Sequence, residues 1–131
     1  MAKKTKFTEL KKIFSTLHGP KGCLWDKKQT HRSLIPYLKE ETQEFIQAAR
    51  SNNIHHMKEE LGDILLQVMF HSQIAEKENK FNIEDVIEEL AKKMKRRHPH
   101  VFANVKVKSA SHITRNWNKI KAVEKGRKVK L

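Results

Sequence analysis

Two pairs of acidic residues stand out because the spacing within each pair suits one face of a helix. Glu41 and Glu44 are three residues apart, and so are Glu60 and Asp63, and residues three apart share a helix face. Two antiparallel helices joined by the polar turn 51–53 would aim both pairs into one space. Four converging carboxylates repel one another unless a cation lies between them. An all-oxygen ligand set without a thiolate suits Mg²⁺ or Mn²⁺.

The same acidic pairs have a plainer interpretation, which is that they lie on solvated helix surfaces. Their position in the hydrophobic pattern argues against this, because Glu41 falls in a row with Leu38 and Phe45, and Glu60 falls in a row with Ile64. These acids therefore border the core face, where a carboxylate without a partner is costly. A di-iron bundle would use Glu-x-x-His pairs, and the sequence contains none.

Charge is distributed unevenly along the chain, whose net charge is +13. Residues 40–90 carry 12 acidic and 4 basic side chains, whereas the two flanks together carry 3 acidic and 24 basic ones. An acidic centre between basic ends is typical of a cation site surrounded by groups that attract phosphate. The alternative is a basic module that binds nucleic acid.

Hydrophobic periodicity predicts five amphipathic helices and no strand. The chain has only four Gly and three Pro, which favours long helices joined by short loops over a many-stranded sheet. The predicted fold is therefore all-α, a helical bundle in one domain over residues 1–125, followed by a frayed basic tail at 126–131. The expected helices span about residues 7–17, 33–50, 54–78, 82–97 and 111–123, with a loop at 19–30.

The sequence also favours a soluble protein of a reducing compartment. Its lone cysteine, Cys23, cannot form an internal disulfide. No apolar run follows the first charged residues, and no stretch approaches the ~20 apolar residues of a membrane span. We therefore expect a cytoplasmic protein with no membrane partner. P-loop chemistry is not expected either, because no glycine-rich phosphate loop is present.

Several segments resemble the MazG-type nucleotide pyrophosphohydrolases, whose pattern is Glu-x-x-Glu followed by Glu-x-x-Asp after one to two dozen residues. Here 15 residues separate Glu44 from Glu60. The resemblance covers about residues 10–125 and is greatest to the first domain of family members that carry two in tandem. The similar segments are GCLWDKKQT (22–30), PYLKEETQE (36–44), EELGDILLQVMFH (59–71), RRHPHVF (96–102) and NWNKIKAVEK (116–125).

This resemblance implies an activity and the residues that would carry it. Glu41, Glu44, Glu60 and Asp63 would hold Mg²⁺, with Mn²⁺ as a substitute. A metal-activated water would attack a nucleoside triphosphate, releasing the monophosphate and pyrophosphate. The catalytic candidates are Glu40, Glu41 and Glu44, and the sequence does not choose which carboxylate accepts the proton of the water. The implied role is removal of surplus or non-canonical triphosphates, and a nucleotide sensor without turnover is a further alternative.

The resemblance also implies a nucleotide-binding set, which consists of Lys93, Arg97, Trp117 and Lys121. Lys93 and Arg97 are four apart and would grip phosphates, while Trp117 would stack on the base. The alternatives stay open, since Trp117 is equally well explained as a core anchor and the two cations as solvated charges. Family members are bundles completed by a partner subunit, and the apolar face over residues 57–69 likewise predicts a homodimer. Nucleic acid stays open as an alternative partner, secondary to the triphosphate.

Overall fold

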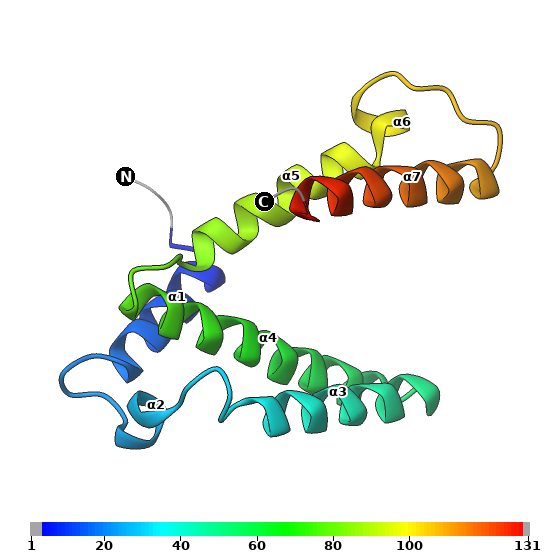
Figure 1. The fold of residues 1–131 in the computed structure, drawn as a ribbon. Helices are drawn as coiled ribbons and strands as arrows, with labels where there is room; N and C mark the ends of the chain where they lie inside the picture. The colour runs from blue at the N-terminus through cyan, green and yellow to red at the C-terminus, as the bar shows by residue number, and fades with distance from the viewer. Residues whose placement is uncertain (1–3, 130–131) are drawn as a thin grey trace. The chain divides into compact units, whose positions relative to one another are not determined.

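The computed structural model describes residues 4–129, with side chains described as far as Gly126 (Figure 1). All regular structure in residues 4–129 is helical, so the all-α prediction is confirmed. The chain divides into two compact units, residues 1–83 and 84–131, which are described here one at a time.

The described residues of the first unit form four helices, and side chains cap the start of the first and the last of them. The Thr5 hydroxyl accepts a hydrogen bond from the backbone N–H of Thr8 at 3.1 Å, and the Asn53 side chain accepts one from the N–H of His56 at 3.1 Å. Such side chains satisfy N–H groups that the first turn of a helix leaves unpaired. The helices are α1 (Lys6–Leu17), α2 (Leu24–Lys28), α3 (Ile35–Arg50) and α4 (Ile54–Lys77).

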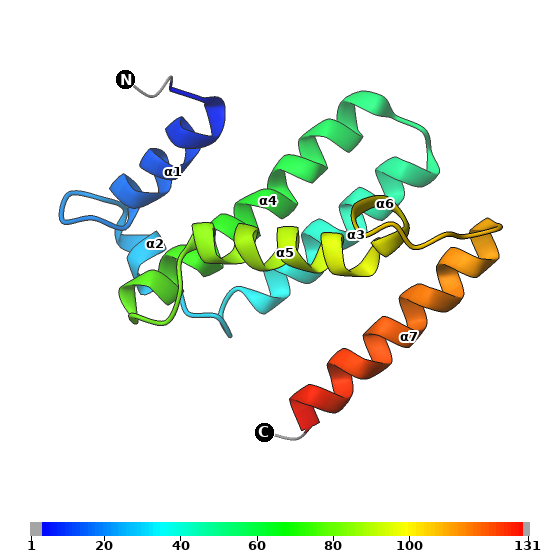
Figure 2. The same ribbon diagram turned by 90° about the horizontal axis from the view of Figure 1, so that it is seen from above.

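A tight turn makes α3 and α4 antiparallel neighbours, as both views show (Figure 2). Asn52 lies in the left-handed region with φ 55°, which asparagine tolerates better than most residues. The backbone N–H of Asn53 donates to the carbonyl of Ala48 at 3.2 Å, closing the end of α3. Because the connection is so short, residues near the end of α3 lie opposite residues near the start of α4.

The core of the first unit lies where α1 packs on the second half of α4. Phe14 of α1 and Phe70 of α4 meet edge to face with ring centroids 6.4 Å apart. By contrast, no residue of α4 before Gln67 is buried. The first half of that helix therefore positions side chains without contributing to this core. The core cluster consists of Phe14, Leu34, Met69, Phe70 and Ile74.

A histidine pair ties the segment before α3 to α4. Nδ1 of His31 lies 2.8 Å from Nδ1 of His71, so one imidazole donates the hydrogen bond and the other accepts it. Burial lowers the pKa of His71, and the charge of His31 lowers it further, which favours this neutral arrangement. Within the segment, Thr30 and Ser33 exchange hydrogen bonds between side chain and backbone at 2.9 and 3.1 Å.

The second unit is held together by charged and aromatic side chains. None of its residues 84–126 is buried. Glu124 of the last helix instead forms ion pairs with Arg96 and Arg97 of the first, each at 3.0 Å. Polar contacts thus take the place of a core here. The helices are α5 (Ile83–Arg97), α6 (Pro99–Phe102) and α7 (Ala110–Val129).

The five predicted helices are all present, and the structure adds two short ones. The helix α2 lies inside the predicted loop 19–30, and α6 begins at Pro99, just beyond the predicted helix 82–97. Residues 126–129 of the predicted tail continue α7, while 130–131 lie outside the described residues. None of the described helices is long and apolar enough to cross a membrane.

Candidate active site

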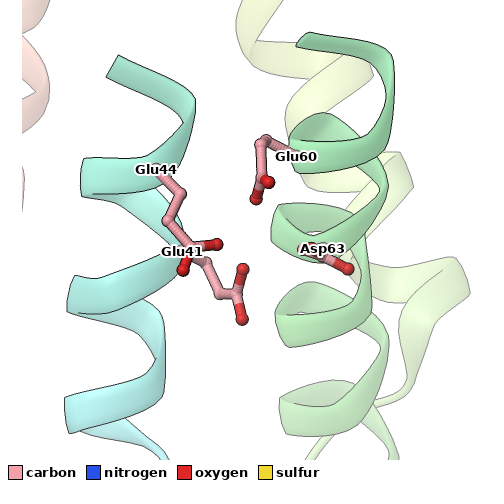
Figure 3. Close-up of side chains that lie close together, drawn as sticks. All are labelled: Glu41, Glu44, Glu60 and Asp63. Carbon is pink, nitrogen blue, oxygen red and sulfur yellow. The ribbon is translucent and has the colours of Figure 1, made fainter. Parts of the chain in front are cut away.

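The turn between α3 and α4 brings the two predicted acidic pairs together (Figure 3). Glu41 and Glu44 extend from α3 toward Glu60 and Asp63 of α4, and one oxygen from each residue lies within 4.8 Å of the others. All four residues are half-buried. The predicted convergence of these carboxylates is therefore confirmed.

The electrostatics of this acidic cluster favour the uptake of positive charge. Burial raises the pKa of Glu41 to about 7, with further contributions from the charges of Asp63 and Glu44. Burial likewise raises the pKa of Glu60 to about 7, together with its hydrogen bond to Glu44 and the repulsion among the carboxylates. A carboxyl group with such a pKa holds a proton near neutrality because a second negative charge nearby is unfavourable.

Two oxygens of the cluster also lack hydrogen-bond partners. Among the described residues, Oε2 of Glu41 and Oε2 of Glu60 are buried and accept no hydrogen bond. A buried acceptor of this kind is costly and calls for an explanation. A hard divalent cation would supply the missing partner, since carboxylate oxygens are the ligands that Mg²⁺ and Mn²⁺ prefer. The residues present therefore fit a divalent ion.

A hollow of about 320 Å³ adjoins the cluster. Besides Glu44 and Glu60, its wall contains three polar residues that were not predicted as site residues: Gln47, Ser51 and His56. One signal was available, because His56 is four residues before Glu60 and so shares its helix face. The lining residues are Glu44, Gln47, Ala48, Ser51, His56 and Glu60.

Glu40, the remaining catalytic candidate, stands apart from the cluster. It is exposed on α3 and is not among the four residues whose oxygens converge. Its role as a proton acceptor stays a prediction.

The predicted nucleotide-binding residues all belong to the second unit. The guanidinium carbon of Arg97 lies 5.2 Å from the ring centroid of Trp117, within range of a cation–π interaction. The ring of His98 meets Trp117 edge to face at 5.1 Å. Lys93 of α5 and Lys121 of α7 are half-buried. The structure thus brings Arg97 and Trp117 together, and the nucleotide-binding role of the set stays a prediction.

Comparison with known protein families identifies a domain family that this chain matches. Residues 29–102 match the family model of the MazG nucleotide pyrophosphohydrolase domain. The chain belongs to the MazG family. The matched MazG region contains all four carboxylates of the cluster as well as Lys93 and Arg97, whereas Trp117 and Lys121 lie beyond it.

Individual MazG relatives extend the similarity to most of the chain. The nucleoside triphosphate pyrophosphohydrolase/pyrophosphatase MazG of Thermotoga maritima is 53% identical over 93% of this chain and 46% of its own length. The nucleoside triphosphate pyrophosphohydrolase of Escherichia coli K12 is 38% identical over 88% of this chain and 44% of its own. The chain thus spans less than half of these relatives. The crystal structure of a mazG-related protein from Thermotoga maritima superposes with a TM-score of 0.68 at 25% identity, covering 86% of this chain and 96% of that one.

Proposed function

We propose that this chain hydrolyses nucleoside triphosphates to the monophosphate and pyrophosphate with the help of Mg²⁺. The observation that carries the proposal is the cluster of four half-buried carboxylates, two of which present buried oxygens without hydrogen-bond partners. Membership of the MazG family supplies the reaction class, and relatives named nucleoside triphosphate pyrophosphohydrolases support it. The proposed role is removal of surplus or non-canonical triphosphates in the cytoplasm.

The acidic residues of the site provide the metal ligands and the proton acceptor in this proposal. The four cluster carboxylates hold the ion, for which Mn²⁺ is an alternative of similar chemistry. When bound, Mg²⁺ supplies positive charge that acidifies water and offsets the charge of phosphate oxygens. One carboxylate among Glu40, Glu41 and Glu44 accepts the proton of the attacking water.

The substrate-binding tasks fall to the second unit. Lys93 and Arg97 bind phosphate oxygens, for which the guanidinium of Arg97 has the matching fork geometry. Trp117 binds the base, and Lys121 lies one helical turn further along α7. Lys93 and Lys121 are half-buried, and this supports the assignment, because lysines that face only solvent are mostly exposed.

We also propose that the protein works as a homodimer. The first half of α4 carries apolar side chains, of which Leu61 and Leu65 are 50% and 43% exposed. A stripe of this kind on the helix that bears half of the acidic cluster is suited to a partner subunit.

A panel of triphosphates, canonical and non-canonical, tests the proposed activity. With Mg²⁺ present, we expect equal amounts of monophosphate and pyrophosphate, measured by chromatography. Release of orthophosphate would contradict the assignment of the broken bond. Glu60→Ala should lower the rate on the order of a hundredfold or more, because the ion loses a ligand. Glu59→Ala is the matched control, since it removes an exposed carboxylate one residue away.

The basic flanks support a second candidate, a module that binds nucleic acid. It predicts binding to single-stranded or duplex DNA or RNA that weakens steeply with salt and survives Glu60→Ala. A triphosphate sensor would instead bind the nucleotide with Mg²⁺ and release no pyrophosphate. The same panel, run with a binding measurement beside it, separates these alternatives.

A further inference from the structure

Glu124 of α7, a residue that the proposed function does not use, is the centre of a charged network. Its Oε1 accepts a hydrogen bond from Nε of Arg97 at 3.1 Å and forms an ion pair with Nη2 of Arg97 at 3.0 Å. Its Oε2 accepts from Nε and Nη2 of Arg96 at 3.2 and 3.0 Å. Nε of Arg97 also donates to Oε2 at 3.4 Å, so Oε2 contacts both arginines. Only 13% of the Glu124 side chain and 15% of the Arg97 side chain are exposed.

This network fixes Arg97 on two sides. Glu124 takes the inner edge of the guanidinium, and the ring of Trp117 lies against it with the guanidinium carbon 5.2 Å from the ring centroid. A guanidinium has five N–H donors in a rigid plane. Glu124 accepts hydrogen bonds from Nε and forms an ion pair with Nη2, so the outer edge of the guanidinium, which carries Nη1, is not engaged by Glu124. That outer edge has the fork geometry that matches a phosphate.

We propose that Glu124 is a positioning residue for triphosphate binding, which holds the guanidinium of Arg97 so that its outer edge meets a phosphate group. This inference rests on the proposed function, because it assumes that Arg97 binds the substrate. Trp117 serves as the second support of the same guanidinium. A preoriented arginine loses less conformational freedom when the phosphate arrives, and the phosphate is bound more tightly for that reason.

The charge of Glu124 in this network does not change with pH near neutrality. The hydrogen bond from Arg97 holds the pKa of Glu124 well below its usual range, at about 2, against the opposing effect of burial and with added help from Arg96. Glu124 is therefore charged at any pH near neutrality. A change in nucleotide affinity between about pH 6 and 9 cannot come from its protonation.

Removal of Glu124 is expected to change triphosphate affinity in the direction opposite to the one that net charge alone predicts. Glu124 is negative, so its removal leaves more positive charge near Arg97 and should, by charge alone, tighten the binding of an anion. If Glu124 positions Arg97, its removal must instead weaken the binding. A structural link between α5 and α7 with no part in binding would change the melting temperature and leave affinity unchanged.

The experiment compares the wild-type chain with Glu124→Gln. The dissociation constant of a non-hydrolysable triphosphate analogue with Mg²⁺ is measured by calorimetry. The kcat and KM are measured with a triphosphate that the wild-type chain hydrolyses. We expect both the dissociation constant and KM to rise about tenfold, the loss of one charge-assisted contact, while kcat changes by less than about twofold. Unchanged or tighter binding by a folded variant overturns the inference.

Two further variants sharpen the test. Glu88→Gln is the matched control, because it removes a carboxylate of the same unit whose ion pair with Lys92, at 2.7 Å, is largely exposed, and wild-type affinity is expected. Glu124→Asp keeps the charge but shortens the reach to Arg97, so an intermediate affinity is expected. If circular dichroism shows that Glu124→Gln does not fold, the Glu124→Asp variant carries the test, and wild-type affinity in it overturns the inference.

The result with the wild-type chain distinguishes failure of the proposed function from failure of the positioning role of Glu124 alone. If the wild-type chain neither binds nor hydrolyses any triphosphate with Mg²⁺, the proposed function fails and this inference fails with it. If the wild type binds the analogue and Glu124→Gln binds it equally well, only the inference fails.

Discussion

Glutamates in this chain show two opposite electrostatic environments. Burial and, after it, neighbouring carboxylates raise the pKa of Glu41 and Glu60 to about 7, whereas two arginines lower that of Glu124 to about 2. The first environment is suited to taking up a cation, and the second to holding cations in place. The same functional group is thus proposed to bind a cation in one unit and to position an arginine in the other.

These environments differ in how far the sequence could predict them. The acidic cluster follows from spacing, because residues three apart share a face and a short turn places two such faces opposite each other. The hydrogen-bond partners of Glu124 are 27 and 28 residues away in the sequence. Because its neighbours in the sequence include lysines, Glu124 resembles an ordinary surface charge. Only the fold shows that two arginines converge on it.

The raised pKa values predict how pH and Mg²⁺ act on stability. In the metal-free folded chain Glu41 and Glu60 bind protons up to about pH 7, but in the unfolded chain only up to about 4.5. Their contribution to the free energy of unfolding is therefore present at low pH and is lost as the pH rises through this window. Mg²⁺ competes with those protons, so we expect it to raise the melting temperature more at about pH 8 than at about pH 5.5.

Thermal unfolding followed by circular dichroism, with and without Mg²⁺, measures this difference. Glu60→Gln should lose most of the response to Mg²⁺, while Glu59→Gln, which changes an exposed neighbour, should keep it. An equal response to Mg²⁺ in the Glu60→Gln variant would show that the ion binds elsewhere.

At the scale of elements, the long helices were predictable and the short ones were not. The helices α1, α3, α4, α5 and α7 each carry apolar residues at helical spacing over several turns, which is the pattern that sequence reading detects best. The helix α2 has five residues and α6 has four, too few for any periodicity. Pro99 lies just beyond the end of α5 and is the first residue of α6, where its missing N–H costs nothing.

The connection between α1 and α2 depends on one glycine. A Cβ at Gly22 would lie 2.0 Å from the carbonyl oxygen of Leu17, and the N–H of Cys23 donates to that same oxygen at 2.8 Å. Because backbone atoms would have to move, we expect Gly22→Ala to lower the free energy of unfolding by about 1–3 kcal/mol. Urea unfolding measures this loss.

A second glycine provides the control for that experiment. A Cβ at Gly126 of α7 would meet nothing within 4 Å. Gly126→Ala should therefore be neutral or stabilise the chain by up to about 1 kcal/mol, as expected in a helix. Equal unfolding midpoints for the wild type and Gly22→Ala would show that the approach to Leu17 can be relieved cheaply.

At the scale of the whole molecule, hydrophobic burial is concentrated in one place. The buried core cluster joins α1, the residue before α3 and the second half of α4, while residues 84–126 contain no buried side chain. The sequence predicted apolar helix faces correctly but could not show which of them pack within one chain, since periodicity marks a face and not its partner. The first half of α4 is the clearest case, because it has an apolar stripe and no buried residue.

A homodimer would bury that stripe, and its mass is directly measurable. Leu61, Leu65 and Val68 fall at positions i, i+4 and i+7 of α4 and are 50%, 43% and 38% exposed. We expect light scattering to give twice the chain mass of 15.4 kDa. Burying a leucine is worth about 1.5–3 kcal/mol, and a two-fold interface contains each residue twice, so Leu65→Lys should shift the protein to the monomer. Glu59→Lys adds a lysine on the opposite face of α4 and should leave the dimer intact. If the wild-type chain is a monomer with the helix content of the structure, this stripe is covered within the chain and the proposed dimer must be abandoned. The acidic cluster would still stand, because it needs only α3 and α4.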